Sequence, residues 1–446
     1  MDNSEALYNG LLFRGQLKNM SDTKNKWHAI ALVVTILLVA ANLRVPFTSI
    51  APVLPLIQND FGLSASALGL LTSLPLLAFA AFSPLSASLA RRFGIERTLF
   101  GALLIISLGI LLRSAGSACA LYAGTVLIGT GIALGNVLLP GLIKRDFSTK
   151  MASMTGAYSI TMGAAGAVGS AVIIPLTQSW GWPIALSLLV ATPLLALVVW
   201  LPQLKKHEHV NLSGPKQAST VAVWRSSLAW QVTLFMGLNA MPFYVAVGWL
   251  PTILMDHGIS PEQAGAVHGT LQLATAIPGL ILAATLRRLK DQRLAAATVS
   301  LLTASSLIGL MYAPGYALLW AALLGFGSGA SMMLGLTFIG LRTKNAGDTA
   351  ALSGMAQCVG YLMAAAGPLL LGQLHDWSGG WTAPLLITAA IAVAGAFTGM
   401  LAGRNVQLDH SHCKSATMPH NEPANMADTH RSRPSNPIKN VTVITE

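Results

Sequence analysis

One residue of the sequence has a chemistry that conflicts with its surroundings. Arg44 interrupts an apolar stretch over residues 29–57, and about 24 Å of helix separates it from His28 on one side and from Asp60 on the other. Its side chain is too short to reach water at either end, and its guanidinium stays charged at any ordinary pH. Because a fixed charge in hydrocarbon is costly and usually marks a functional site, Arg44 is the first candidate for binding a small anion.

Arg44 has a structural alternative. No aspartate or glutamate lies in the core of a predicted helix, so the sequence offers no buried carboxylate as its partner. Pro46, Pro52 and Pro55 nevertheless free backbone carbonyls close by, and these carbonyls together with water are able to satisfy a buried guanidinium. Both interpretations of Arg44 stay open at this point.

Polar residues also occur in pairs at the spacing of one helical turn. Residues three or four apart share one face of a helix. Four such pairs fall inside predicted helices: Arg44 with Thr48, Tyr158 with Thr161, His268 with Gln272, and Gln357 with Tyr361. Such pairs either bind a solute or form interhelical hydrogen bonds, which are worth only about 0.6 kcal/mol in a membrane. We expect these eight residues to form a substrate-binding site, with the interhelical alternative open for each pair.

The elements that must position these residues are membrane helices. The chain has 446 residues, of which 53% are hydrophobic and only 10% charged, against roughly 25% charged in soluble domains. A helix of about twenty apolar residues crosses a hydrocarbon core of roughly 30 Å. Twelve such segments are predicted, at approximately 28–57, 67–90, 98–117, 119–143, 152–177, 183–203, 228–254, 263–286, 294–313, 316–341, 350–373 and 381–402. The expected fold class is an all-α membrane protein with twelve transmembrane helices.

The twelve helices are predicted to form two parallel six-helix repeats. The stretch "PFTSIAPVLPLIQNDFGLS" at 46–64 aligns with "PFYVAVGWLPTILMDHGIS" at 242–260 at an offset of 196 residues. Arg44 falls on Ala240 at this offset, and a scaffold role would be expected in both copies, so the single arginine favours one asymmetric ligand. Six crossings return the chain to its starting side, which is typical of one large class of secondary transporters.

The repeat and the polar segments give the expected domain organisation. Residues 1–203 form an N-terminal tail and the first six-helix half, and residues 228–404 form the second half. Residues 204–227 are the central loop between them, and residues 405–446 are a tail with too little apolar surface to bury, which predicts disorder.

The basic residues orient the chain in its membrane. The net charge of +11 comes from 27 lysines and arginines, almost all of which lie in the tails and after the even-numbered predicted helices. By the positive-inside rule both termini and the central loop are cytoplasmic. This distribution explains the basic excess without a nucleic-acid partner, and the lipid bilayer is the expected environment.

Several motifs resemble one transporter family. "LARRFGIERTL", "GIALGNVLLPGLIKRDF", "TGAYSITMGAA", "GFGSGASMMLGLTFIGLR" and "SGMAQCVGYLMAAAGP" are similar to sequences of the cyanate and 2-nitroimidazole permease family of the major facilitator superfamily, closer to the 2-nitroimidazole branch. The resemblance covers about residues 27–404 and implies a transporter of cyanate, a nitroimidazole or another small planar compound.

The same resemblance implies a cytoplasmic gate at the basic turns after the second and eighth helices. The superfamily's turn has an aspartate where this chain has Arg91, so the usual acidic partner is missing and Glu96 is a candidate replacement. The expected gate residues are Arg92, Glu96, Arg97, Arg288 and Arg293.

The expected function is transport by alternating access of a small polar or anionic solute. No phosphate-binding loop, metal-ligand motif or nucleophile motif occurs, so no enzyme activity, cofactor or metal site is predicted. The alternatives are an efflux carrier for drugs or metabolites in which Arg44 is structural, and, less favoured, a membrane sensor that transports nothing. Coupling to a proton or a counter-anion stays open, with His268 as the one titratable histidine well inside a helix. We expect a monomer in the bacterial inner membrane.

Overall fold

The structure is a computed structural model that describes residues 30–205, 223–279, 281, 291–344 and 346–408. The first half begins with a helix over residues 30–42, followed by α2 (Val45–Thr48), the 3-10 turn η1 (Ala51–Val53), α3 (Leu54–Phe61), α4 (Ala65–Phe93), α5 (Ile95–Arg113), α6 (Ala118–Asp146), the 3-10 turn η2 (Ser148–Lys150), α7 (Met151–Leu188), α8 (Ala191–Trp200) and the 3-10 turn η3 (Leu201–Lys205). The second half contains α10 (Ser227–Asp256), α11 (Pro261–Ala274), α13 (Arg293–Tyr312), the 3-10 turn η4 (Pro314–Tyr316), α14 (Ala317–Leu341), α15 (Ala346–Ser378) and α16 (Thr382–Ala402).

The described residues contain ten helical segments that are long and apolar enough to cross a membrane. Two features account for the difference from the twelve predicted helices. The segment Ser153–Leu204 contains two predicted helices that are joined at Gly181, where a φ of 75° turns the chain within a single residue and Pro183 starts the next helix. The eighth predicted helix is described as α11 and a short helical turn at residues 277–279, and its end lies outside the described residues.

The first predicted helix is not continuous. The chain departs from helical backbone angles at Arg44, where φ is −120° and ψ is −48°, and turns at residues 43–44 and 49–50 bound the four residues of α2. Pro46, Pro52 and Pro55 cause this break, because a proline lacks the N–H that would bond to the preceding turn. Arg44 is the residue that caps α2, so the arginine sits at the break itself.

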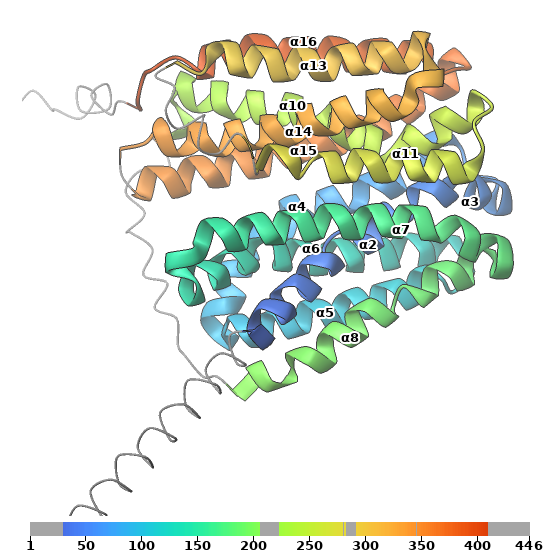
Figure 1. Cartoon of the computed structure of the whole chain (residues 1–446), viewed down its shortest axis with the longest axis horizontal. Helices are drawn as coiled ribbons and strands as arrows, with labels where there is room; N and C mark the ends of the chain where they lie inside the picture. Colours follow the sequence, from blue (N-terminus) through green and yellow to red (C-terminus); the bar gives the residue numbers. More distant parts are fainter. Residues whose placement is uncertain (1–29, 206–222, 280, 282–290, 345, 409–446) are drawn as a thin grey trace, which may run out of the picture. The chain divides into compact units, whose positions relative to one another are not determined.

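The two halves meet through two pairs of helices. The helix α4 packs against α15, and α7 packs against α11 (Figure 1). Glycines make these contacts close: a Cβ on Gly69 would lie 2.4 Å from the Pro368 carbonyl oxygen, and one on Gly265 would lie 2.9 Å from that of Ser170. Small residues at such contacts allow helix backbones to approach each other in a membrane, where dispersion replaces the hydrophobic effect as the main attraction.

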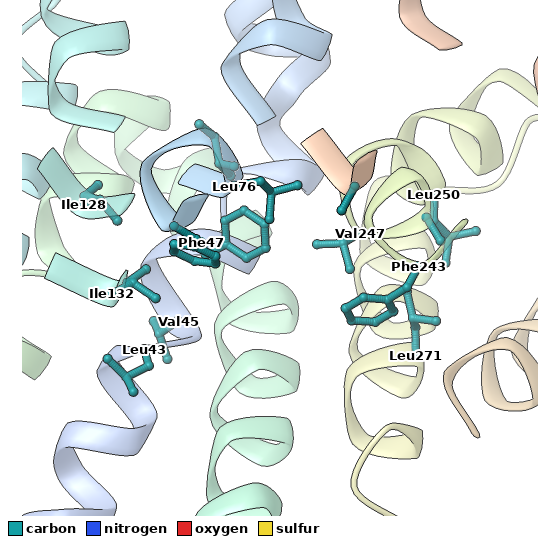
Figure 2. Close-up of a cluster of buried hydrophobic side chains, with 14 of the residues drawn as sticks. Leu43, Val45, Phe47, Leu76, Ile128, Ile132, Phe243, Val247, Leu250 and Leu271 are labelled. Carbon is teal, nitrogen blue, oxygen red and sulfur yellow. The ribbon is translucent and has the colours of Figure 1, made fainter. Parts of the chain in front are cut away.

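Buried apolar side chains from both halves form one cluster behind the break. Figure 2 shows Leu43, Val45 and Phe47 of the first half and Phe243, Val247 and Leu271 of the second half within it. Phe47 and Phe243 are equivalent residues at the 196-residue offset, and both are buried. Buried apolar side chains of both halves therefore pack around the helix break at Arg44.

Contacts at both ends of the bundle repeat between the halves. We call the end that carries Asp60, Asp256, Glu262 and Asp376 the acidic end, and the end that carries Arg92, Arg145, Arg342 and Arg404 the basic end. At the acidic end the Trp182 indole N–H donates to the Asp60 carboxylate, and the Trp381 indole N–H donates to that of Asp256. The aspartates are equivalent at the 196-residue offset, and each accepts from a tryptophan of its own half, although Trp182 and Trp381 are 199 residues apart.

The acidic end also ties the two halves together. The Asp376 carboxylate at the end of α15 accepts hydrogen bonds from the backbone N–H groups of Ala65 and Ser66 and from the Ser66 hydroxyl at the start of α4. Gln178 of α7 donates to Glu262 at the start of α11. Each contact joins the ends of two helices that already pack against each other.

Candidate functional site

Arg44 lies between the halves and retains access to solvent. Its neighbours Leu43 and Val45 are buried, whereas Arg44 itself is half-buried. Its side chain passes Gly166 of α7, where an added Cβ would lie only 2.9 Å from the Arg44 Cγ. Gly166 is therefore the residue whose lack of a side chain gives the arginine its path.

The Arg44 guanidinium contacts the second half through polar and aromatic groups. Its Nε donates to the Gln272 side-chain oxygen at 3.1 Å, and its Cζ lies 5.2 Å from the centre of the Phe243 ring. Tyr158, Tyr244 and Tyr361 lie near enough to interact with it electrostatically. Among the described residues no carboxylate forms an ion pair with Arg44. The described partners of the charge are thus an amide oxygen and an aromatic ring.

A chain of hydrogen bonds continues from Arg44 into the protein. Gln272 also contacts His268 through its amide nitrogen, 3.3 Å from the imidazole Nε2, and His268 Nδ1 lies 3.0 Å from the Ser170 hydroxyl. The Ser170 hydroxyl donates to the Gly166 carbonyl at 2.9 Å. Gln272, His268 and Ser170 are all fully buried, so in this state the chain supports Arg44 from behind and does not face solvent.

Aromatic rings surround the guanidinium. Tyr244 makes edge contacts with Phe243 and Phe47, with ring centres 5.1 and 6.0 Å apart. Tyr361 makes an edge contact with Phe79 at 5.4 Å. An arginine set among aromatic faces can bind a planar, electron-rich group by hydrogen bonding at its edge and stacking on its face.

The other residues predicted for the site divide into two groups. Thr48 is buried, and its hydroxyl donates to the backbone oxygens of Arg44 and Gly166, so it fixes the break. Tyr158 lies with its hydroxyl 3.5 Å from the Asn136 side-chain oxygen. Gln357 bonds to Ser353 on its own helix, and Thr161 is half-buried on α7, so no described contact brings either of them to Arg44.

Sequence reasoning missed two residues beside Arg44. Tyr244 and Phe243 both contact its surroundings, and neither was among the predicted site residues. The repeat contained the necessary signal, because Tyr244 is equivalent to Thr48 at the offset of 196 residues. No comparable sequence signal marks Ser170, whose hydroxyl contacts His268, because serines are common in membrane helices.

A second arginine, Arg113, holds the broken helix. It is fully buried at the end of α5, and its Nη1 donates to the Pro46 carbonyl at 2.7 Å. Its Nε and Nη2 have no hydrogen-bond partner among the described residues. Arg113 therefore satisfies a carbonyl exposed by the break that presents Arg44.

The predicted gate residues lie at the basic end, and the described ones make separate contacts. Glu96 is buried and pairs with Arg145 at 2.6 Å, within its own half. The Arg92 guanidinium lies over the Phe93 ring at 5.2 Å, and Arg293 pairs with Asp291 at 3.4 Å. Arg97 is exposed, and Arg288 lies outside the described residues.

The contact of Glu96 has a neutral counterpart in the second half. Gln292 is the residue equivalent to Glu96 at the 196-residue offset, and its side-chain oxygen accepts a hydrogen bond from Arg342 Nη2 at 2.8 Å. Arg342 also donates to the Ala402 carbonyl at 2.9 Å. An arginine thus contacts equivalent acceptor positions at the basic end of each half, a carboxylate in one and an amide in the other, although Arg145 and Arg342 are 197 residues apart.

Metal binding finds no support in the described part of the chain, where no group of three or more histidine, cysteine, aspartate or glutamate side chains is placed to hold an ion.

These features define the class of the protein. Apolar helices in two equivalent halves, closed by repeated contacts at the ends and carrying a polar centre, are the architecture of secondary transporters that work by alternating access. The chain belongs to the Major Facilitator Superfamily, whose family model matches residues 32–365. It is a multi-pass membrane transporter for a small molecule and not an enzyme, which confirms the predicted class of twelve helices in two six-helix repeats.

Comparison with known proteins adds particular relatives. The chain is 54% identical over 380 residues to the 2-nitroimidazole transporter of Escherichia coli strain K12, an alignment that covers 85% of this chain and 97% of the relative. It is 26% identical to the cyanate transport protein CynX of the same organism, over 78% of this chain and 91% of the relative. A solved bacterial homologue of the human lysosomal transporter Spinster superimposes with a TM-score of 0.69 at 17% identity, covering 84% of this chain and 96% of that one. The resemblance to the cyanate and 2-nitroimidazole permeases is therefore confirmed.

Proposed function

We propose that the chain transports a small planar solute that carries a carboxylate, cyanate or nitro group, and that Arg44 binds this group. The observation that carries the proposal is the Arg44 guanidinium itself, which is half-buried between the halves without an ion-pair partner among the described residues. Carboxylate and nitro groups each present two oxygens in one plane, which matches the paired donors of a guanidinium. The names of the relatives, which include a 2-nitroimidazole and a cyanate transporter, support the same chemistry.

The aromatic residues account for the planar part of the proposed solute. The Arg44 guanidinium lies over the Phe243 ring, and Tyr244 and Tyr361 of the second half and Tyr158 of the first half lie near it. A ring held between such faces gains stacking energy of about 0.5–1.5 kcal/mol for each good pair. In this proposal Arg44 fixes the polar group and the aromatic residues select a flat molecule.

The experiment compares Arg44→Lys and Arg44→Gln in purified, folded protein. Binding of benzoate, cyanate and 2-nitroimidazole is measured by isothermal titration calorimetry and by counterflow in liposomes. Arg44→Lys should retain part of the affinity because the charge survives, whereas Arg44→Gln should lose about 2 kcal/mol, or about thirtyfold. If folded Arg44→Gln binds as tightly as the parent, Arg44 is structural and the efflux-carrier alternative gains support.

We propose that the basic end is the cytoplasmic gate. Arg92 lies in the last turn of α4, and Arg288, which lies outside the described residues, is its equivalent at the 196-residue offset. Alanine at either position should change the transport rate more than substrate affinity, because a gate alters the populations of states and makes no contact with solute. Reduced affinity with unaltered turnover in both variants would contradict this role.

We propose that the chain is a monomer in the bacterial inner membrane with both termini cytoplasmic. The concentration of basic residues at one end supports this orientation. In intact cells a cysteine introduced at Ser179 or Gly258 should react with an impermeant maleimide, and one at Ser213 should not. The opposite labelling pattern would reverse the orientation, and light scattering of the purified protein tests the monomer.

A further inference from the structure

The hydrogen-bond chain behind Arg44 has only one possible direction. An arginine side chain has donors only, so Gln272 must turn its oxygen towards Arg44 and its NH₂ group towards His268. The His268 Nε2 must then be the acceptor, which places the imidazole proton on Nδ1, facing Ser170. Ser170 in turn donates to the Gly166 carbonyl. The chain therefore requires a neutral His268 in a single tautomer.

Protonation of His268 is incompatible with this arrangement. A proton on Nε2 would face the Gln272 NH₂ group, donor against donor. Rotation of the Gln272 amide by a half turn restores a hydrogen bond to His268, but it then points the NH₂ group at Arg44 Nε. Arg44 loses its acceptor in that state and gains a second positive charge close by. Both changes increase the affinity of the guanidinium for an anion.

We infer that His268 is a proton-binding site coupled through Gln272 to Arg44, so that the chain carries an anion together with a proton. The inference rests on the proposed function of Arg44 as the anion site. Arg44 and His268 both contact Gln272, so the positive charge of Arg44 opposes a second charge on His268, and an anion bound at Arg44 removes that opposition. Because binding coupling is reciprocal, a proton on His268 strengthens anion binding by the same factor. The proton is taken from water when the anion binds and is returned to water when the anion leaves.

Gln272 also controls access to the proton site. His268 and Gln272 are both fully buried, and Gln272 is the group that lies between the His268 Nε2 and the half-buried Arg44. A displacement of Gln272 by an anion at Arg44 therefore opens the imidazole lone pair towards the solvent that reaches Arg44. The proton and the anion thus arrive from the same side.

Other ionisable groups near His268 do not fill this role. The elements packed against α11 are α7, α10, α14 and η1, and the described contacts of the imidazole with them are the Ser170 hydroxyl and the Val247 backbone. The tyrosines around Arg44 are neutral groups in the pH range of the test. On α11 itself, hydrogen bonds from its own backbone, from Gln178 and from Ser260 lower the pKa of Glu262, so this exposed carboxyl stays ionised at neutral pH.

The test measures protons taken up when an anion binds. Benzoate or cyanate is added to the purified full-length protein in weak buffer with a pH indicator, and Kd is measured from pH 5.5 to 8.5. The parent should take up close to one proton per bound anion, and its Kd should rise by up to tenfold per pH unit where the free form is neutral. His268→Gln should take up none and have a Kd that does not vary with pH. The control is His257→Gln, at the exposed end of α10, which should behave as the parent does.

The possible failures are distinguishable. If neither anion binds the parent, the anion site fails and this inference fails with it. If an anion binds without proton uptake, or with uptake that persists in His268→Gln, the inference is wrong while the anion site stands. A second measurement needs no variant at position 268 to be active: nitrogen NMR of histidine-labelled parent should show His268 protonated on Nδ1 alone without anion and on both nitrogens with it. An Nε2–H tautomer without anion would overturn the proposed chain.

Discussion

The substitution Gly166→Ala tests whether the path of the Arg44 side chain determines substrate affinity. The added Cβ would lie 2.9 Å from the Arg44 Cγ, 3.4 Å from the Thr48 hydroxyl and 3.5 Å from the Gln272 Cγ, so the arginine has to move. The Cγ is close to the backbone, and its displacement shifts the whole guanidinium away from Gln272. Overpacking of this kind costs about 1–3 kcal/mol. If 1–2 kcal/mol of that appears as lost contact with the anion, Kd rises about five- to thirtyfold.

Two glycines provide matched controls for this measurement. Gly163 is one turn away on α7, and a Cβ there would lie 3.0 Å from the Gln272 backbone oxygen without reaching Arg44, so Gly163→Ala reports on the spacing of α7 and α11 alone. Gly141 in α6 has nothing within 4 Å, so Gly141→Ala reports on the helix itself. Kd for benzoate is measured by calorimetry on each folded variant, with thermal unfolding as a check. Equal losses in Gly163→Ala and Gly166→Ala, or no loss in Gly166→Ala, would refute the role of the Arg44 path.

Five further substitutions, at four positions, test the supporting contacts. Arg113→Met frees a carbonyl of α2 but also removes two unpaired buried donors. Kd for benzoate should therefore rise while the unfolding temperature falls little. A lower unfolding temperature with unchanged Kd would contradict this. Glu96→Gln copies the arrangement at Gln292 and should cost about 1 kcal/mol or less. Glu96→Ala should cost about 1–3 kcal/mol because it removes one of the two carboxylates that pair with Arg145, and both costs are measured by thermal unfolding. Trp182→Phe and Trp381→Phe should each cost about 1 kcal/mol, and losses that differ several-fold would show that the acidic ends of the halves are not equivalent.

The sequence predicted the helices well because a membrane helix leaves a simple pattern. Length and hydropathy mark each crossing, and the positions of prolines and glycines explain where the structure departs from it. The connection between the fifth and sixth predicted helices is a single residue, Gly181. The first predicted helix is divided into shorter helices near Arg44, where prolines interrupt the backbone hydrogen bonds. Both departures follow from backbone chemistry at a named residue.

The contacts of the site could be predicted only in part. Arg44, Gln272 and His268 stand out as polar residues in apolar segments, and the structure brings these three together. The contact of Gln272 with His268 follows from their spacing on α11. The contacts of Arg44 with Gln272 and of His268 with Ser170 depend on how neighbouring helices pack, which no spacing within one helix reveals. Gln357 shows the converse, because a polar residue at helical spacing bonds to its own helix.

Differences between the repeats show which parts of the first half serve the solute. The first half has Arg113 beside Gly124, and the equivalent pair in the second half is Gly309 beside Trp320, so the bulky residue has changed sides of the same contact. The helix that Arg113 contacts is broken at Arg44, two residues before Pro46, whereas α10 runs without interruption through the equivalent Pro242.

These differences coincide with the placement of charge. Arg44 at the break has Ala240 as its counterpart within the continuous helix, while the aspartate–tryptophan and arginine contacts at the two ends are kept in both halves. The ends must close alternately in any carrier of this class, so equivalent contacts are expected there. A solute has no such symmetry. A charge, a helix break and a buried brace that occur together in one half only are therefore best explained by a ligand held at that break.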